Sequence, residues 1–305
     1  MAARLPVVHH PAYVAEVGDG HRFPMGKFGA LAAVLKAEGF APDGFHVPEP
    51  APRDWLIRAH DAAYVDGILD LTLDPKAVRR IGLPLNGTVA LRARLATAGT
   101  VLTARLALAH GAACNTAGGS HHAGPSAGAG FCVFNDVAVA ARVLMDAGAL
   151  SRVLVVDLDV HHGDGTALIF AAEPRVTTFS MHCVGNWPLD KPPSDRDVDL
   201  PAGMGDDAYL AALSRHLPEV LEAARPDLVF YNAGVDPHRD DALGKLALSD
   251  GGLAARDAFV LETCLRAGVP VAGVIGGGYA KDVLRLAQRH ASLHRASASA
   301  LARYG

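Results

Sequence analysis

Carboxylates and imidazoles are concentrated in one short segment, directly after the apolar run Val153–Val156. Asp157, Asp159, His161 and Asp164 all lie there within eight positions. Charged groups are costly in an apolar interior unless something compensates them. A divalent cation is the simplest compensation, because Asp oxygen and His nitrogen are normal zinc ligands. The segment therefore predicts a metal site at the end of a buried strand. The alternative, a polar turn whose aspartates cap a helix, needs only one acidic residue.

The spacing of these residues suggests which of them bind the metal. Asp159 and His161 are two apart, so in an extended segment both side chains point to the same side. Asp236, which follows a later apolar run, is the natural third ligand. Two carboxylates and one imidazole leave room for water and substrate, as in a catalytic site. The alternative interpretation of Asp236 is a turn residue before Pro237.

A pair of adjacent histidines, His121 and His122, follows a Gly-Gly turn. Histidine transfers protons near neutral pH with little perturbation, so the pair could act as acid–base groups. Each ring would need an acceptor on its other nitrogen, and Asp157 and Asp164 are available. The sequence thus predicts two His–Asp pairs beside one metal, and the alternative is a purely structural pair.

Tyr279 follows three consecutive glycines, which allow tight turns and close backbone approach. A phenol at this position could donate a hydrogen bond to a developing oxyanion. The alternative is a tyrosine at the start of a helix. Together with a metal that acidifies its bound water, these groups fit hydrolysis of an amide.

The elements that must position these groups alternate between strands and helices. Apolar, β-branched segments predict strands over residues 112–116, 152–156, 175–180, 227–231 and 269–275. Helical patterns separate them, over residues 136–147, 165–172, 206–224, 251–267 and 279–293. This alternation predicts a parallel sheet covered by helices on both faces. Ligands bind at the carboxyl ends of the strands in such sheets, where all four polar clusters fall.

The N-terminal part of the chain is less regular. We expect helices over residues 26–37, 61–71 and 91–109, and a loop over residues 40–53. These segments would pack around the sheet and shape the entrance to the site. Without an internal repeat or a dividing linker, residues 1–305 are predicted to form a single catalytic domain.

Composition excludes several classes of partner. The 305 residues carry 28 basic and 32 acidic side chains, a net charge of -4, without a dense basic run, so we expect no direct nucleic-acid binding. We also expect no signal peptide and no membrane span, and hence a cytoplasmic protein. Its cysteines form no C-x-x-C pair and are expected to be free thiols in the core: Cys114, Cys132, Cys183 and Cys264. The sequence does not define an oligomeric state.

Four stretches of the sequence resemble the histone deacetylase superfamily in order and spacing, between Ala113 and Lys281. They are GGSHHAGPSAGAGFCVFND, VLVVDLDVHHGDGTALIF, NAGVDPHRDDALGKLALS and GGGY. The third stretch and the short N-terminal part look most like class IV and its bacterial relatives. The part before residue 100 matches only loosely.

This resemblance implies the arginase–deacetylase fold, a three-layer α/β/α arrangement with a parallel sheet of about eight strands. It implies that His122, paired with Asp164, is the main general base and acid. His121, paired with Asp157, would assist electrostatically, and Tyr279 would polarise the scissile carbonyl. The implied metal is zinc, with Fe2+ or Co2+ as alternatives, on Asp159, His161 and Asp236.

The resemblance also implies a tunnel for an acyl-lysine side chain and a structural potassium ion. The tunnel would be lined by Gly130, Phe131, Leu243 and, on the opposite wall, Trp187. The potassium site would comprise Asp157, Asp159, His161, Ser180 and Met181. The substrate could carry an acetyl or a longer acyl group, on a protein lysine or on a small amine such as an acetylpolyamine. An arginase-like ureohydrolase would need a second metal, for which Gly163 lacks the carboxylate, and a non-catalytic binder would not need Tyr279.

Overall fold

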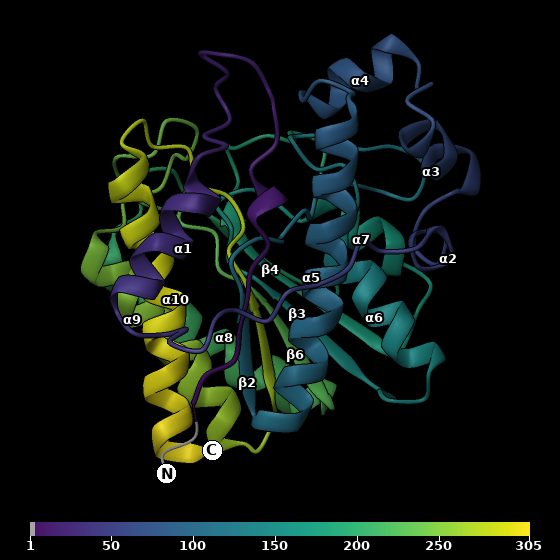
Figure 1. The fold of residues 1–305 in the computed structure, drawn as a ribbon. Helices are drawn as coiled ribbons and strands as arrows, with labels where there is room; N and C mark the ends of the chain where they lie inside the picture. Colours follow the sequence, from purple (N-terminus) through teal and green to yellow (C-terminus); the bar gives the residue numbers. More distant parts are fainter. Residues whose placement is uncertain (1–3) are drawn as a thin grey trace.

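The computed structural model describes residues 4–305, and its centre is a parallel sheet of seven strands (Figure 1). The strand order is β1-β2-β7-β6-β3-β4-β5, and every neighbouring pair is parallel. The parallel α/β class is thus confirmed, with seven strands where about eight were expected. The strands are β1 (Val7–Val8), β2 (Ala112–Asn115), β3 (Val153–Asp157), β4 (Val176–Cys183), β5 (Arg196–Leu200), β6 (Leu228–Asn232) and β7 (Val271–Val274).

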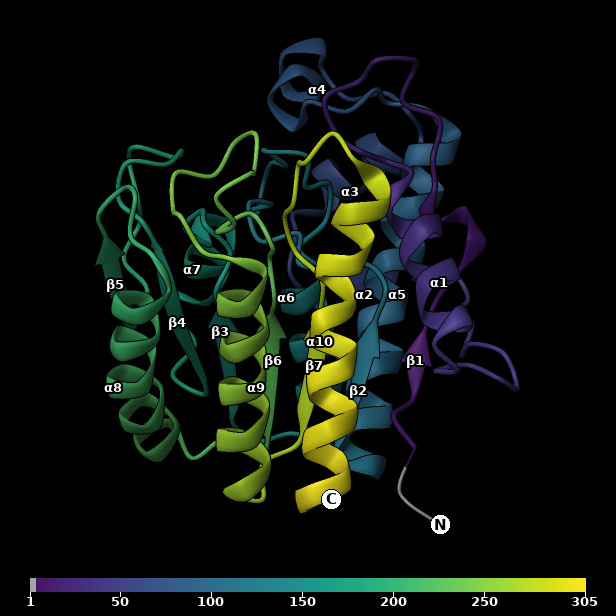
Figure 2. The ribbon, with the colours of Figure 1, turned by 90° about the vertical axis from the view of Figure 1, so that its left-hand side faces the viewer.

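Helices cover both faces of the sheet and complete the three layers. Figure 2 shows α8, α9, α10 and α1 side by side in front of the sheet, with α5, α6 and α7 behind it. The helices are α1 (Lys27–Ala37), α2 (Arg53–Leu56), α3 (Ala62–Leu69), α4 (Pro75–Ile81), α5 (Gly87–His110), α6 (Asp136–Asp146), α7 (Asp164–Phe170), α8 (Asp206–Ala224), α9 (Asp250–Arg266) and α10 (Val283–Tyr304), with a short 3-10 helix, η1 (Pro11–Tyr13).

The central strand β3 is buried along its whole length because it packs against a helix layer on each side. Its side chains alternate between the two faces. Leu154 and Val156 belong to the core under α8 to α10, whereas Val153 and Val155 belong to the core under α5 and α6. Each such residue contributes roughly 1.5–3 kcal/mol when fully buried. This two-sided burial explains the continuous apolar run in the sequence.

The edge strands β1 and β5 were not predicted. β5 alternates charged and apolar residues, Arg196-Asp197-Val198-Asp199-Leu200, because it borders solvent at the end of the sheet. Charged edge strands are a common protection against edge-to-edge association. A search for continuous apolar runs misses such a strand, and β1 has only two residues.

The C-terminal helix differs from the prediction at both ends. It was expected over residues 279–293, but α10 begins at Val283 and continues to Tyr304. The side chain of Asp282 caps the helix by accepting a hydrogen bond from the backbone N–H of Arg285. Tyr279 therefore lies in the loop before the helix, after glycines with positive φ at Gly276 and Gly278.

Two expectations about the chain's surroundings can be compared with the structure. None of the helices in residues 4–305 combines the length and the apolar character that crossing a bilayer requires. All four cysteines are free and buried, as expected for small core residues.

Candidate active site

The loops that follow β3 and β6 are held together by one buried arginine side chain. The two strands are adjacent, with Asp157 opposite Asn232 in the register. Arg256 of α9 is fully buried, and its guanidinium donates hydrogen bonds to the carbonyl oxygens of Leu158 (3.2 Å) and Gly234 (2.6 Å). These bonds join the loop after β3 to the loop after β6. They fix the backbone from which the predicted metal ligands project.

The three predicted metal ligands converge at this point. Nδ1 of His161 lies 3.0 Å from Oδ1 of Asp159 and 3.1 Å from Oδ2 of Asp236. All three side chains are buried, and their ligand atoms lie within 4.8 Å of one another. The structure therefore brings together two residues that lie 77 positions apart in the sequence, Asp159 and Asp236.

The charge of this cluster fits a divalent cation. Burial and the charge of Asp159 raise the pKa of Asp236 to about 7. Burial alone would lower the pKa of His161, but hydrogen bonds to both carboxylates raise it to about 10. The two carboxylates thus stabilise a positive charge on the His161 ring. A bound metal ion would supply positive charge at this point more effectively. One imidazole nitrogen and two carboxylates form a suitable zinc donor set with positions left open.

The backbone of Gly277 lies against the two carboxylates. Its N–H donates to Oδ2 of Asp159 at 2.7 Å. A Cβ atom at this position would lie 2.2 Å from Oδ2 of Asp236. A residue with a side chain would therefore displace a predicted metal ligand, which explains one glycine of the Gly-Gly-Gly-Tyr motif.

Both predicted His–Asp pairs are formed. Nδ1 of His121 donates to Asp157 at 2.7 Å, and Nδ1 of His122 donates to Asp164 at 2.5 Å. The amide of Asn232 donates to the other oxygen of Asp157 at 3.0 Å. In each pair the carboxylate holds the ring and leaves Nε2 as the remaining nitrogen.

The two histidines differ in charge. Burial alone would lower the pKa of His121, but Asp157 and Asp159 raise it to about 9. Burial and the charge of His121 lower the pKa of His122 to about 4, although Asp164 acts in the opposite direction. At neutral pH His122 is therefore neutral and able to accept a proton, whereas His121 carries a positive charge.

A pocket of about 580 Å³ opens onto these groups. All four predicted substrate-binding residues line it, together with His122, His161 and Tyr279: Gly130, Phe131, Trp187 and Leu243. The Trp187 and His122 rings are 4.7 Å apart, edge to face. The volume of this pocket lies in the range of small-molecule sites.

The pocket wall contains backbone in the left-handed region. Gly130 has φ 54° and Phe131 has φ 68°, a conformation that non-glycine residues rarely adopt. A Cβ atom on Gly130 would lie 2.6 Å from Cδ2 of His122 and 3.0 Å from the Trp187 ring. The narrow wall thus depends on a glycine next to the proposed base, and strained backbone of this kind is typical of functional sites.

Tyr279 is half-buried beside the metal ligands. Its ring centroid is 6.3 Å from that of His161, and its backbone N–H donates to Oδ2 of Asp241 at 2.7 Å. Burial, with the charge of Asp159, raises the pKa of the Tyr279 hydroxyl well above its usual range. The phenol therefore stays protonated and can donate a hydrogen bond.

The predicted potassium ligands lie at the carboxyl end of β3, in the loop that follows it and within β4. Asp157 and Ser180 are register partners, and Met181 follows in β4, while Asp159 and His161 lie in the loop after β3. The hydroxyl of Ser180 is hydrogen-bonded to a neighbouring histidine of β4. The potassium site stays a prediction.

Several residues at the site were missed from the sequence. The amide nitrogen of Asn186 lies 3.3 Å from Nε2 of His161 and donates to the Leu243 carbonyl at 2.8 Å. Asp241 positions Tyr279, as described above, and its place in the third quoted stretch could have identified it. Exposed cations at the pocket come from three separate segments and form no dense run: Arg22, Arg79, Arg80 and Lys245.

Comparisons with known proteins identify related sequences and a related fold. Residues 21–294 match the model of the histone deacetylase domain. An uncharacterised protein of Picosynechococcus sp. is 53% identical over 293 residues, 96% of this chain and 98% of its own length. Histone deacetylase 2 of Arabidopsis thaliana is 30% identical over 280 residues, 87% of this chain and 71% of its own.

The fold also resembles a solved structure. The crystal structure of the HDA15 HD domain superposes with a TM-score of 0.80, covering 99% of this chain and 89% of that one. Sequence identity to it is 23%, so this comparison concerns the fold alone.

Proposed function

The chain belongs to the histone deacetylase family of hydrolases, and we propose that it removes an acyl group from lysine side chains. The observation that carries the proposal is the position of His122. It is a buried, neutral histidine held by Asp164, and it lines the same pocket as His161 and Tyr279. Acceptor, metal ligand and hydroxyl donor thus face one space, as hydrolysis of an amide requires.

Asp159, His161 and Asp236 would hold the ion, which we propose is zinc, with Fe2+ or Co2+ as alternatives. When bound, the ion supplies electrophilic polarisation of the amide carbonyl and a more acidic water. The residues of the chain move the protons. Nε2 of His122 accepts the water proton while Asp164 holds Nδ1, and the same ring returns a proton to the leaving amine. Tyr279 donates to the oxyanion, and protonated His121 stabilises negative charge nearby.

The charge at the mouth of the pocket bears on the substrate. Four exposed cations surround an opening that ends at His122 and His161, and the guanidinium of Arg22 lies 5.0 Å from the Phe131 ring centroid. Like charges across an interface are unfavourable, so this rim disfavours a polycationic acetylpolyamine. It favours acyl-lysine with neutral or acidic neighbours. A small acylated amine without further positive charge is the alternative substrate.

Further features belong to the same proposal. The stretch NAGVDPHRDDALGKLALS supports a class IV-like enzyme, and the potassium site would lie beside Asp157. We place the catalytic function in one domain over residues 1–305. The four buried free thiols support a reducing, cytoplasmic location.

The test is hydrolysis of one lysine peptide that carries an acetyl, octanoyl or myristoyl group. Zinc-loaded protein is assayed with and without a chelator, and each peptide is made with glutamate or with lysine on both sides of the acylated residue. We expect chelator-sensitive release that is faster for the acidic flanks, and the preferred chain length would describe the tunnel. The matched control is His122→Ala, which should lose turnover while retaining zinc.

Two results would contradict the proposal. Release that survives both the chelator and His122→Ala would show that the described site does not perform the reaction. Zinc-loaded protein that cleaves none of the peptides but cleaves an uncharged acylated amine would transfer the activity to the small-molecule alternative.

A further inference from the structure

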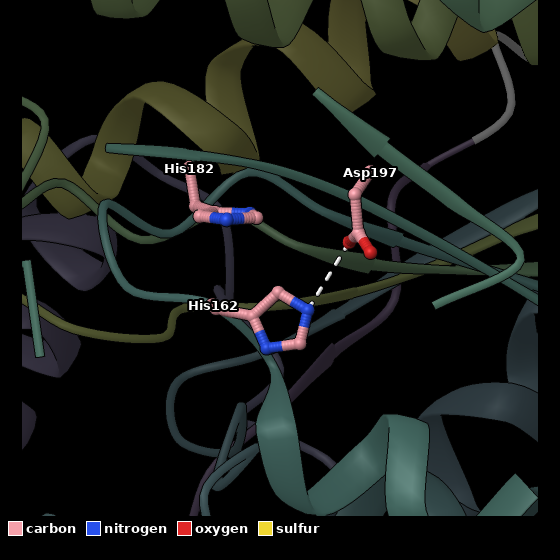
Figure 3. Close-up of side chains that lie close together, drawn as sticks. All are labelled: His162, His182 and Asp197. Carbon is pink, nitrogen blue, oxygen red and sulfur yellow. Dashed lines mark hydrogen bonds and ion pairs between the residues drawn. The ribbon is translucent and has the colours of Figure 1, made fainter. Parts of the chain in front are cut away.

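A second cluster of metal-binding side chains lies outside the active site (Figure 3). His162 comes from the loop after β3, His182 from β4 and Asp197 from β5. Each offers one ligand atom, and these atoms lie within 4.8 Å of one another. Both imidazoles are buried, and the Asp197 side chain is 29% exposed. Three elements far apart in sequence thus place two imidazoles and a carboxylate around one point.

This cluster is separate from the active site, although His162 follows His161 directly. Successive side chains of an extended segment point to opposite sides. His161 contacts Asp159 and Asp236, as described above. Nε2 of His162 instead lies 3.1 Å from Oδ1 of Asp197, along the dashed line in Figure 3, and 3.2 Å from the hydroxyl of Ser194. The loop after β3 therefore presents one imidazole to each cluster.

Among residues 4–305, two ring nitrogens of the cluster find no hydrogen-bond partner. Nδ1 of His182 is hydrogen-bonded to the Ser180 hydroxyl at 3.0 Å, which orients the ring. Nε2 of His182 is buried and makes no hydrogen bond, although Oδ1 of Asp199 lies 3.0 Å away. Nδ1 of His162 is likewise buried and finds no partner in the described part of the chain, while Nε2 of the same ring faces Asp197. Leaving such nitrogens unpaired is unfavourable. A histidine with one nitrogen fixed by a hydrogen bond and the other facing a carboxylate is prepared to bind a metal.

The register of β4 and β5 explains how the sequence builds this arrangement. Ser180 is opposite Asp197, and His182 is opposite Asp199. Residues two apart in a strand share a face, so both aspartates of β5 lie on the same side as His182. The backbone N–H of Ser194 donates to Oδ2 of Asp197 at 2.9 Å, which leaves Oδ1 for His162. The Asp199 side chain is 63% exposed at the sheet edge and marks an entry path for an ion.

We propose that His162, His182 and Asp197 bind a divalent transition-metal ion, zinc by the chemistry of the ligands. Two imidazole nitrogens and one carboxylate suit zinc, and Asp199 or water would complete four-coordination. Imidazole ligands distinguish the site from a calcium or magnesium site, which would use oxygen throughout. The ion would join the loop after β3 to the edge strand β5. Its role is structural, since it holds the loop that also carries His161.

The experiment counts metal ions and does not depend on activity. Bound zinc is measured after equilibrium dialysis at buffered free zinc, in a constant potassium concentration, for wild type and Asp197→Asn. The same two measurements are repeated in an Asp236→Asn background, in which the proposed catalytic ion binds more weakly. His182→Asn is a second variant at the new site. Asp190→Asn is the matched control, because it removes an exposed aspartate of the neighbouring loop that is not in the cluster.

We expect wild type to bind one zinc ion more than Asp197→Asn. The Asp236→Asn variant should keep one zinc ion, and the double variant that also carries Asp197→Asn should lose it. Loss of a direct ligand should weaken binding by more than the roughly 10–100-fold effect of an outer hydrogen-bond partner. Zinc should raise the melting temperature of Asp236→Asn but not of the double variant. Asp190→Asn should match wild type.

Equal zinc content in wild type and Asp197→Asn would overturn the proposal, as would Asp236→Asn that binds no zinc. Circular dichroism in chelator verifies that Asp197→Asn is folded, and the asparagine can still hydrogen-bond His162. If either Asp197→Asn or His182→Asn fails to fold, the zinc content of the other variant decides whether the second ion is bound. Failure of the proposed deacylase activity leaves these counts unaffected, so the two proposals fail separately.

Discussion

The rings of His121 and His122 lie 4.1 Å apart, centroid to centroid, yet only one of them is charged at neutral pH. Two carboxylates raise the pKa of His121 to about 9, whereas burial and the charge on His121 lower the pKa of His122 to about 4. The positive charge of one ring thus keeps its neighbour neutral. A base and an electrostatic stabiliser are obtained from two adjacent histidines because a second carboxylate oxygen, Oδ1 of Asp159, lies 3.8 Å from Nε2 of His121, whereas His122 is paired with Asp164.

The two histidines should therefore contribute unequally. His122→Ala removes the proton acceptor and is expected to lower kcat by about 10²–10⁴-fold, the usual range for general acid–base catalysis. His121→Ala should cost less, because the proton acceptor, His122, stays in place. Both variants should retain zinc, measured in the same preparations. A larger loss for His121→Ala than for His122→Ala would reverse the assignment.

Gly130→Ala should impair the site by steric contact. The added methyl would lie 2.6 Å from the His122 ring on backbone with φ 54°, so the ring or the wall must move. We expect kcat/KM to fall by at least about 100-fold, as for a misplacement of about 1 Å in other active sites. Gly124→Ala is the matched control, because its nearest contact would be an ordinary 3.7 Å. Equal activity of the two variants would show that the wall is free to adjust.

Arg256→Met should destabilise the fold. The substitution leaves the buried Asp257 carboxylate, 2.8 Å from Arg256, without its charged partner and releases the two loops of the metal site. Breaking a buried ion pair in this way typically costs about 3–5 kcal/mol. Urea unfolding measures the loss, with Arg239→Met at an exposed position as the control. A change below 1 kcal/mol, taken as about the value of a surface pair, would contradict this role.

Glu173 should contribute stability that is lost in acid. Hydrogen bonds from Arg175 and Arg142 lower the pKa of Glu173 from 4.5 to about 2 in the folded protein. Its ionised form therefore stabilises the fold above pH 4.5, and this contribution disappears as the pH falls from 4.5 through 2. After solvent screening of the 52% exposed Arg175, we expect Glu173→Gln to cost about 1 kcal/mol at pH 7.

The measurement is the free energy of unfolding of wild type and Glu173→Gln between pH 7 and pH 3. The difference should be constant down to pH 4.5 and shrink below it. A difference that grows on acidification would show the opposite sign and exclude the assigned pKa shift.

The cationic rim should select among peptides by charge. Arg80→Glu is expected to reduce the preference for glutamate-flanked over lysine-flanked substrates, mainly through KM, because rim charges act on encounter more than on chemistry. The effect should weaken with added salt. Arg239→Glu, away from the pocket lining, is the control. An unchanged preference in Arg80→Glu would exclude this arginine from substrate selection.

The α/β fold class and the residues of the candidate site could both be predicted from sequence patterns. Continuous apolar runs such as Val153–Val156 are required by strands with helices on both faces, and parallel strands bring their carboxyl ends to one edge. Asp159, His161 and Asp236 could be grouped for this reason before any distance was known. Gly130 and the glycines before Tyr279 could also be identified in the sequence. The contacts that require a glycine at these positions could not be predicted from it.

Three features depend on tertiary contacts and could not be predicted: which histidine is neutral, how the rim is charged, and the presence of a second cluster. The pKa of His122 depends on distances to groups from other elements, and the rim cations come from three separate segments. His182 and Asp197 meet only through the register of β4 with an edge strand whose charged, alternating sequence hides it. Local sequence patterns record burial and chain direction. Contacts between distant segments depend on packing, and packing is set by the whole chain at once.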